Sequence, residues 1–393
     1  MHFAPKILGI DISSYTLEAV WAQASGSRPK VLAANRFILS PSLIERGEIK
    51  DKPALAGVIN RLLNQSHPQP ITASTVSIAL PDSRWFYHRC RLEGVSSKTL
   101  HSAIQKEISQ NLPFPIQELL WGWQALPDSQ YLIWAIQRSL VRQWQELLFQ
   151  CGLELEWILP PCLANIYGLE VDSSELTLIM DWGAQNIIIS WIQEGKLREY
   201  LPIAWGSEKL QPFLAKQLSV SLPEVENRLR EADLSQPSSF TQLVQNAIEQ
   251  QVVKEILNFT KNYPNLRPTQ VILIGGMSRL KGLAEFLSQQ LNWPYCRWQL
   301  GQSQPTYPLL KREYVGALGL VLWQLQNAKE GGVRPPALTP LSYRQYLIKV
   351  WNKKATDWLG TFIPYFLHLT FWLVVSSLFI YAILILVSFV LRQ

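Results

Sequence analysis

The sequence predicts an α/β protein made of two related halves, followed by one C-terminal transmembrane helix. Apolar runs with strand-like and helical spacing alternate over residues 1–326, as expected for an α/β domain with buried sheets. A strand that ends in an aspartate and a turn of small residues occurs twice, at Asp11 and at Asp181. Residues 362–391 then run for thirty positions without Asp, Glu, Lys or Arg, and about 20 apolar residues are enough to span a bilayer as a helix.

The first half opens on a predicted β-hairpin. An apolar run at residues 7–10 ends at Asp11, the small hydroxyl residues Ser13 and Ser14 follow, and apolar residues resume at Leu17. The later elements predicted in this half are helices at residues 53–63 and 140–151 and strands at residues 75–80 and 131–136.

The second half repeats the acidic hairpin. Residues 176–180 lead into Asp181 and the small residues Gly183 and Ala184, and residues 187–192 form the returning strand. The elements predicted after it are a helical block at residues 241–260, a strand at residues 271–274 that ends at Gly275 and Gly276, and a helix after Ser278.

Composition excludes several classes of protein. A hydrophobic content of 48% with 11% aromatic residues excludes extended disorder. Residues 328–393 hold +5 of the net charge of +6, so we expect contact with anionic lipid headgroups and no nucleic-acid partner. The four cysteines form no CxxC pair, and His67, His88 and His101 are scattered, so no metal site is expected from them. No GxSxG, HExxH or Walker A pattern occurs, and no catalytic residue is predicted.

The two aspartate turns are of a type that binds phosphates. An acidic residue at a strand end lets its carboxylate hold a divalent cation, usually through water, while the backbone amides of the small turn approach phosphate oxygens. Asp11 and Asp181 both fit this pattern. Gly275 and Gly276, between a strand and a helix, let the backbone pass close to a flat ligand such as adenosine. Taken singly, each motif is also typical of an ordinary hairpin or of close packing.

The order and spacing of these motifs resemble the actin-like ATPase superfamily, and within it the PilM family of type IV pilus assembly proteins, relatives of the cell-division protein FtsA. The resemblance covers residues 6 to about 325. Beyond the aspartate turns it rests on the passages at residues 46–49 (RGEI), 79–81 (ALP), 111–115 (NLPFP) and 315–320 (VGALGL).

The resemblance implies two ribonuclease H-like lobes around a nucleotide cleft, with an inserted subdomain over about residues 85–158. It implies a cytoplasmic scaffold that binds the N-terminal peptide of a PilN-like inner-membrane protein and helps to align the pilus machine. Asp11 and Asp181 would hold Mg²⁺ through water. The residues expected at the nucleotide are Asp11, Ser13, Ser14, Asp181, Gly183, Ala184, Glu226, Gly275, Gly276, Met277 and Lys281.

The chain departs from the family pattern at the first turn, where Ser13 replaces a glycine and Glu18 replaces a lysine. A Cβ at Ser13 narrows the turn, and an anion at Glu18 is expected to repel phosphates by about 1 to 4 kcal/mol. ATP hydrolysis is therefore not expected. Two alternatives for the cofactor stay open: ATP with Mg²⁺ bound structurally, or no cofactor.

The tail predicts a membrane anchor. Glycines and prolines at residues 327–342 predict a linker, and residues 343–361 form a basic juxtamembrane segment. The excess of Lys and Arg before the span places the N-terminal domain in the cytoplasm. The family resemblance implies that the span crosses the inner membrane of a bacterium once. Residues 337–344 loosely resemble a PilN leader peptide, so they either dock on the inserted subdomain or act as a plain tether.

The sequence therefore predicts a membrane-anchored scaffold of a type IV pilus or type II secretion platform. The type II secretion protein GspL has a related arrangement of an actin-like part and one span. Its expected partners are a PilN-like protein, other platform proteins and the lipid bilayer, together with self-association. The alternatives are a membrane-attached ATPase or phosphotransferase and an FtsA-like filament former.

Overall fold

The computed structural model describes residues 4–25, 29–40, 42–169, 171, 174–263, 266–293, 297–300, 310, 312–327 and 333–336. The chain divides into two units, Met1–Pro335 and Pro336–Gln393, and the elements below belong to the first. The predicted juxtamembrane segment and transmembrane helix lie outside the described residues, as does most of the predicted linker. Among the helices that are described, none combines the length and the apolar character needed to cross a bilayer.

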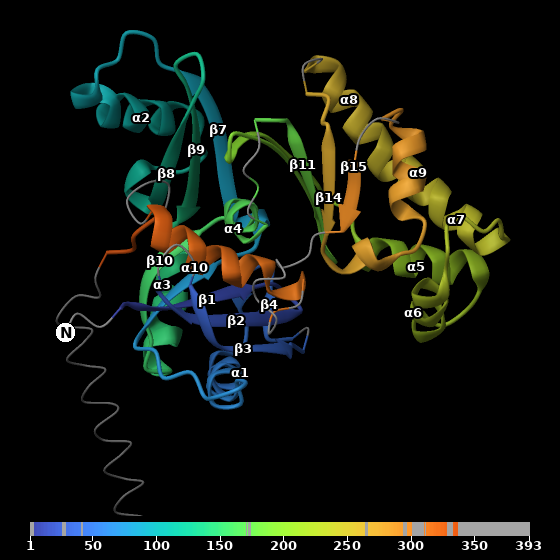
Figure 1. Ribbon diagram of the computed structural model, residues 1–393, viewed down its shortest axis with the longest axis horizontal. Helices are drawn as coiled ribbons and strands as arrows, with labels where there is room; N and C mark the ends of the chain where they lie inside the picture. Colours follow the sequence, from blue (N-terminus) through green and yellow to red (C-terminus); the bar gives the residue numbers. More distant parts are fainter. Residues whose placement is uncertain are drawn as a thin grey trace, which may run out of the picture. The chain divides into compact units, whose positions relative to one another are not determined.

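The first half is built on a five-stranded sheet with the strand order β10-β6-β1-β2-β3 (Figure 1). Its strands are β1 (Lys6–Ile12), β2 (Thr16–Gln23), β3 (Lys30–Ile38), β6 (Thr75–Ala79) and β10 (Glu154–Leu159). β1, β2 and β3 form antiparallel hairpins, whereas β6 runs parallel to both β1 and β10. The hairpin predicted around Asp11 is confirmed.

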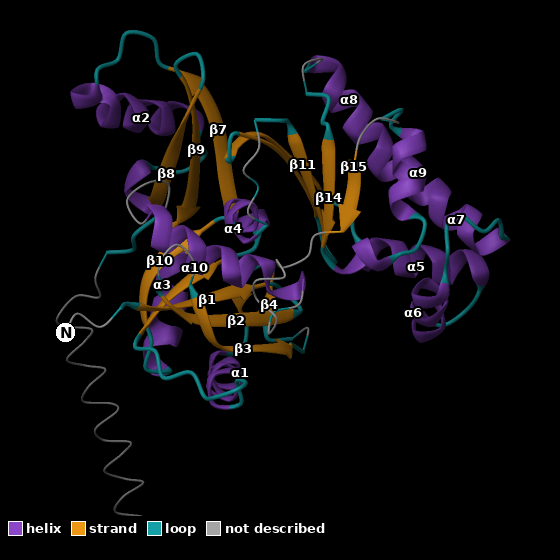
Figure 2. Ribbon diagram, viewed as in Figure 1, coloured by secondary structure: helices purple, strands orange, loops and turns teal. Residues whose placement is uncertain are grey.

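Helices cover both faces of this sheet (Figure 2). The helices α1 (Lys52–Asn64) and α3 (Arg138–Gln150) pack together on one face, and α4 (Pro161–Gly168) and α10 (Val315–Asn327) pack together on the other. Because side chains alternate along a strand, Leu8 of β1 enters one core and Ile7 enters the other. The short elements of this half are β4 (Ile44–Glu45), β5 (Glu48–Ile49), η1 (Asp82–Arg84) and η5 (Arg312–Tyr314).

The second half repeats the connectivity of the first. Its sheet has the order β13-β12-β11-β14-β15. The strands are β11 (Thr177–Trp182), β12 (Ile187–Gln193), β13 (Lys196–Ile203), β14 (Gln270–Ile274) and β15 (Arg297–Leu300). Here too an antiparallel three-stranded meander is followed by a strand parallel to its first member. The two related halves expected from the repeated acidic hairpin are confirmed.

Helices of the second half pack on its sheet around buried Trp182 and Trp191. They are α5 (Ser207–Leu218), α6 (Leu222–Glu231), α7 (Ser239–Ile248), α8 (Lys254–Asn262), α9 (Leu283–Gln290) and η4 (Gly276–Arg279). A π-helical turn, η3 (Glu249–Val253), joins α7 directly to α8. The helical block predicted at residues 241–260 is therefore one helix with a wider turn in its middle.

A separate three-stranded sheet with the order β7-β9-β8 is inserted into the first half. Its elements are β7 (Trp85–Arg91), α2 (Ser97–Asn111), η2 (Ile116–Glu118), β8 (Leu119–Leu126) and β9 (Gln130–Gln137). The sequence predicts an inserted subdomain over about residues 85–158. The separate sheet ends at Gln137, because the apolar face of α3 packs on the first sheet and β10 is a strand of that sheet.

Close backbone contacts hold α10 on the first half. A Cβ at Gly319 would overlap the carbonyl oxygen of Ala164 in α4, and one at Gly168 would overlap the carbonyl of Val315. A Cβ at Gly316 would meet the carboxylate of Asp11. These glycines let α10 approach α4 and the end of β1, so the last helix fixes the surroundings of Asp11.

We predict that Gly319→Ala lowers the free energy of unfolding by about 1 to 3 kcal/mol, because the added methyl group meets a rigid helix backbone. Gly57→Ala is the matched control. Gly57 lies in the exposed interior of α1 with nothing within 4 Å of its Cβ position, so alanine there should stabilise the chain by about 0.5 to 1 kcal/mol. Denaturant unfolding followed by tryptophan fluorescence measures both changes, and equal effects of the two variants would contradict the packing argument.

Candidate functional site

Parallel strand pairing brings the acidic residues of the two halves to strand ends. Asp11 of β1 pairs with Ala79 of β6, and Asp82 follows shortly after β6 ends. In the second half, Asp181 of β11 pairs with Ile274 of β14, immediately before Gly275. Since parallel strands end at the same edge of a sheet, each half presents its acidic residues and turns at one edge.

Side-chain hydrogen bonds connect the two aspartate turns. The Ser14 hydroxyl donates to Gln185 Oε1 at 3.3 Å, and Gln185 Nε2 donates to Glu208 Oε1 at 3.2 Å. The Tyr15 hydroxyl donates to the same Glu208 oxygen. From α4, Asn165 Nδ2 donates to Asp181 Oδ2 at 3.1 Å. The turn after Asp11 therefore faces the turn after Asp181, as the resemblance implies.

The glycines of the second half surround the turn after Asp181. A Cβ at Gly206 would overlap the carbonyl oxygen of Ala184, and one at Gly275 would overlap the backbone of Trp182. Gly275 has a φ of 84°, in the left-handed region that favours glycine. Gly276 has no atom within 4 Å of its Cβ position, so its backbone borders open space. Gly183, Ala184, Gly275 and Gly276 thus lie together around this turn.

Three other predicted nucleotide residues have contacts of their own. Glu226 forms an ion pair with Arg230 at 2.5 Å on the exposed face of α6. Met277 packs against the core of the second half. Lys281 is exposed, and its carbonyl oxygen accepts a hydrogen bond from the Leu234 amide at 2.8 Å. Their predicted role at a nucleotide stays a prediction.

Burial and mutual repulsion raise the pKa values of the carboxyl groups in the cleft. Burial, followed by the charges of Glu18, Asp181 and Asp82, holds the pKa of Asp11 well above its usual range. Burial raises the pKa of Asp82 to about 7, and the charge of Asp181 adds to the rise. Burial also raises the pKa of Asp181 to about 6, against the opposing hydrogen bond from Asn165. Among the residues that the structure describes, no cation is found to pair with these three acids, so a divalent cation fits among them.

Ser13 occupies two of the backbone donors of the first turn. Its Oγ accepts hydrogen bonds from the amides of Tyr15 at 3.1 Å and Thr16 at 2.8 Å. Ser13 Oγ also lies 2.8 Å from the Thr16 hydroxyl. A phosphate group would need these same amides, so the first turn does not fit a nucleotide phosphate in this conformation. The carboxylate of Glu208 beside Tyr15 further opposes an anion there.

Glu18 has a different environment from the one the sequence suggests. It lies opposite Asp11 in the β1–β2 hairpin and opposite Arg36 in the β2–β3 hairpin. Arg36 Nε donates to Glu18 Oε1 at 2.8 Å. Burial raises the pKa of Glu18 to about 7 although Arg36 lowers it. The predicted repulsion of phosphates by Glu18 is therefore reduced. Arg36 offsets the negative charge of the carboxylate, and the raised pKa favours its protonated, neutral form.

Four site residues were missed by the sequence reasoning: Asp82, Asn165, Gln185 and Glu208. Asp82 has the same signal as Asp11 and Asp181, because an aspartate follows a short apolar strand that ends at Ala79. The other three carry no such signal. Their roles depend on how α4, α5 and the second turn are placed by the whole fold.

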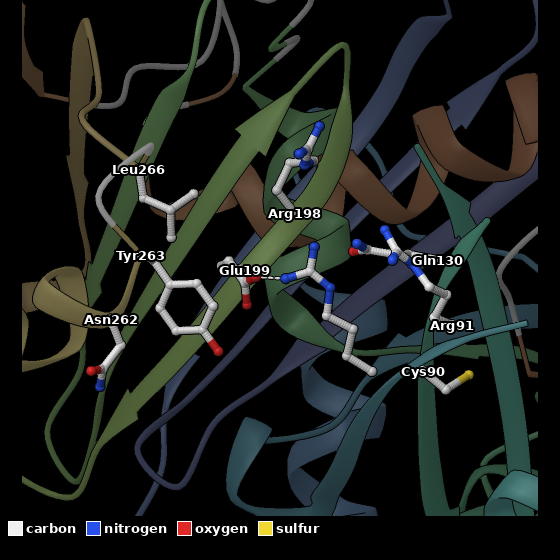
Figure 3. Close-up of a pocket in the computed structure, with 9 residues that line it drawn as sticks. Cys90, Arg91, Gln130, Arg198, Glu199, Asn262, Tyr263 and Leu266 are labelled. Atoms are coloured by element: carbon white, nitrogen blue, oxygen red, sulfur yellow. Dashed lines mark ion pairs between the residues drawn. The ribbon is translucent and has the colours of Figure 1, made fainter. Parts of the chain in front are cut away.

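A pocket of about 520 Å³ lies apart from the aspartate turns, where the inserted sheet meets the second half (Figure 3). Arg89 of β7 forms an ion pair with Glu199 of β13, and the rings of Tyr87 and Tyr200 stack at a centroid distance of 4.1 Å. The residues that line the pocket are Arg89, Cys90, Arg91, Gln130, Arg198, Glu199, Asn262, Tyr263 and Leu266. Three arginines against one glutamate make this pocket basic.

No family model matches the chain. Among solved structures, a chain of the PilM-PilN type IV pilus biogenesis complex matches with a TM-score of 0.65 and 20% identity, over 81% of this chain and 98% of that one. MreB5 of Spiroplasma citri bound to AMPPNP matches with a TM-score of 0.50 and 9% identity, over 82% and 97% of the two chains. The cytoplasmic domain of EpsL, an inner-membrane component of the type II secretion system of Vibrio cholerae, matches over 69% and 83% with 11% identity and a TM-score of 0.37, too low to support an argument.

These similarities confirm the actin-like α/β fold predicted from the sequence. The predicted resemblance to PilM is matched by a structural similarity that extends over nearly the whole of the PilM-PilN complex chain. Side-chain hydrogen bonds bring the two aspartate turns together.

We predict that the chain loses stability as pH rises. Carboxyl groups in the unfolded chain titrate near pH 4, whereas Asp82 and Glu18 in the folded chain titrate at about 7. The folded state therefore binds more protons, and its free energy of unfolding falls as pH rises from about 4 through about 7. Asp82→Asn should remove part of this fall.

Thermal unfolding at about pH 5 and about pH 8 measures this dependence. Asp128→Asn is the matched control, since Asp128 is exposed on the turn between β8 and β9 with a φ of 57° that asparagine also adopts. A pH profile that is the same in Asp82→Asn and in the wild type would exclude the assigned cause.

Proposed function

We propose that the chain is a membrane-anchored scaffold of a type IV pilus or type II secretion platform, which works by binding partners and not by turnover of ATP. The proposal rests on one observation in this actin-like fold: the first aspartate turn binds its own amides through the Ser13 hydroxyl. Ser13 Oγ accepts hydrogen bonds from the amides of Tyr15 and Thr16, so two donors that a phosphate would use at this turn are already taken.

The cleft is also held closed by the protein itself. Tyr15 and Ser14 of the first half reach Glu208 and Gln185 of the second half. In a motor or kinase the halves open and close around a ligand. Here polar side chains bridge them, which favours a fixed platform for other proteins. Asp11, Asp82 and Asp181 would hold Mg²⁺ as a structural ion, and its charge would offset their repulsion.

Similarity to a chain of the PilM-PilN complex supports the choice of partner. That complex joins PilM to PilN, and we propose that this chain likewise binds a short peptide from an inner-membrane protein. The basic pocket at the inserted sheet offers arginines and Tyr263, which is 39% exposed. We place the peptide there, because exposed arginine and tyrosine side chains are typical anchors of protein interfaces.

We further propose that residues 362–391 cross the inner membrane once, with the actin-like domain in the cytoplasm. The uncharged run of thirty residues and the preceding Arg344, Lys349, Lys353 and Lys354 support this orientation. An anchored scaffold is held at the bilayer where its partners reside.

The rival function is a membrane-attached ATPase or phosphotransferase. Asp82 favours it, because a carboxyl group with a pKa of about 7 beside Asp11 has the proton affinity of a general base at neutral pH. The bonds made by Ser13 and Glu208 oppose it, since both compete with a nucleotide phosphate. A steady release of phosphate from Mg-ATP that is lost in Asp82→Asn would establish the rival.

We predict that the wild type binds Mg-ATP weakly and releases no phosphate. Ser13→Gly should raise its affinity for Mg-ATP at least about tenfold, because one hydrogen bond to a charged group contributes about 1.5 to 3 kcal/mol. Ser219→Gly is the control, since Ser219 caps the C-terminus of α5 with a φ of 53° that glycine adopts without strain. Isothermal titration calorimetry and a phosphate-release assay measure both. Equal affinity in Ser13→Gly and Ser219→Gly would argue against the capped turn.

We predict that the full chain in detergent binds the synthetic N-terminal peptide of the PilN-like protein of the same cell. Fluorescence anisotropy should give a saturable curve that a scrambled peptide does not give. Arg91→Glu should weaken binding at least about tenfold if the pocket holds the peptide, since it replaces a favourable charge by a repulsive one. Arg61→Glu on α1 changes the net charge equally at a distant position and should leave binding unchanged. No binding to the wild type would remove the proposed partner.

A further inference from the structure

Three side chains of metal-binding type meet on the inserted sheet. His88 and Cys90 are two residues apart on β7, and Glu107 comes from α2. The ligand atoms of the three residues all lie within 4.8 Å of one another. A metal at this position is not predicted from the sequence, because Glu107 lies seventeen or more residues away from His88 and Cys90.

The strand geometry explains why His88 and Cys90 share a face. Side chains alternate along a strand, so residues two apart point to the same side. The residue between them, Arg89, points the opposite way and pairs with Glu199 of the second half. The face that carries His88 and Cys90 is the one that α2 covers with Ile104 and Ile108.

The spacing of the donors is close to that of a tetrahedral metal site. His88 Nε2 and Glu107 Oε2 are 3.0 Å apart. Two ligands at about 2.0 to 2.1 Å from a tetrahedral Zn²⁺ are roughly 3.3 Å apart, so the pair needs to open by only a few tenths of an ångström. The Cys90 sulfur would move inward by about 1 Å, which a side-chain rotation allows.

We propose that His88, Cys90 and Glu107 bind Zn²⁺ or a similar first-row divalent metal ion, with water as the fourth ligand. Nitrogen, sulfur and oxygen donors of this kind suit Zn²⁺, which binds histidine, cysteine and carboxylate groups in fourfold coordination. The exposed fractions of the His88 and Glu107 side chains, 22% and 25%, leave a path for the ion and room for the water.

A neighbouring group holds the glutamate in position. Asn111 Nδ2 donates to Glu107 Oε2 at 3.1 Å and to the Glu107 carbonyl at 2.9 Å. Hydrogen bonds from residues that do not themselves touch the metal orient its ligands in many metal sites. The Cys90 thiol is protonated in the absence of metal, because burial and then Glu107 raise its pKa to about 11. A protonated thiol is a poor metal ligand. Binding of the metal must therefore displace this proton.

A metal ion at this position would fasten α2 to the inserted sheet. α2 spans fifteen residues, of which Ile104 and Ile108 are buried and Leu100 is partly buried against the inserted sheet, so a narrow apolar stripe attaches it. The ion would add a bridge from Glu107 on the helix to the two ligands on β7. Zinc in the cell would then set the rigidity of the inserted subdomain without any change in the aspartate cleft.

The test uses the untagged full chain in detergent, freed of metal by chelation. Titration with Co²⁺ should produce the near-ultraviolet charge-transfer band of a thiolate bound to cobalt, saturating at one ion per chain, and Zn²⁺ should abolish it. Zn²⁺ should also raise the unfolding temperature of the wild type. The Cys162 thiol lies beside Asp82, so a band from cobalt bound at the aspartate cluster would be lost in Cys162→Ser and kept in Cys90→Ser.

Cys90→Ser should lose the band. It should also weaken zinc binding by more than the roughly 10- to 100-fold that is typical when a residue that only hydrogen-bonds to a metal ligand is replaced. Cys151→Ser is the matched control, because Cys151 is a partly buried thiol on the other side of the first half, near the Ala56 carbonyl. Glu107→Gln should keep the band with weaker binding, provided circular dichroism shows a folded chain. The absence of a band in the wild type, or its persistence in Cys90→Ser, would overturn the proposal.

Discussion

The parallel pairing of β1 with β6, and of β11 with β14, is the constraint on which the cleft depends. It aligns the ends of these strands, so that Asp11 and Asp82 share one edge and Asp181 lies beside Gly275. Burial of acids at such an edge is costly unless a cation or a proton neutralises them. The raised pKa values of the cluster follow directly from that arrangement.

The same cleft shows how a nucleotide-binding fold can serve another purpose. Ser13 satisfies the amides of its own turn, and Glu208 takes hydrogen bonds from both halves. Each of these side chains competes with a phosphate for donors or for space. The carboxylates still suit a divalent ion, so metal binding and nucleotide binding are separable properties of this site.

Local patterns in the sequence predicted most of the fold. The alternation before Asp11 and Asp181 predicted both hairpins, and the same rule applied to residues 75–79 would have found Asp82. Contacts between distant segments could not be read in this way. The Ser14–Gln185 bond joins residues 171 positions apart, and the approach of Glu107 to His88 requires α2 to lie on one particular face of the inserted sheet. The predicted membrane span stays a prediction, since it lies outside the described residues.

The π-helical turn η3 keeps a long helix in register with the sheet beneath it. Val244, Ile248, Val252 and Ile256 are buried at a strict spacing of four residues. In a regular α-helix each such step advances the stripe by about 40° around the axis, so three steps would carry it about 120° away from the core. The wider turn unwinds part of that drift. A single-residue deletion within residues 249–251 would change the spacing of these buried residues to four, three and four. A regular α-helix keeps that spacing on one face, with the last residue only about 20° around the axis from the first, so α8 would stay aligned with α7 without the wider turn.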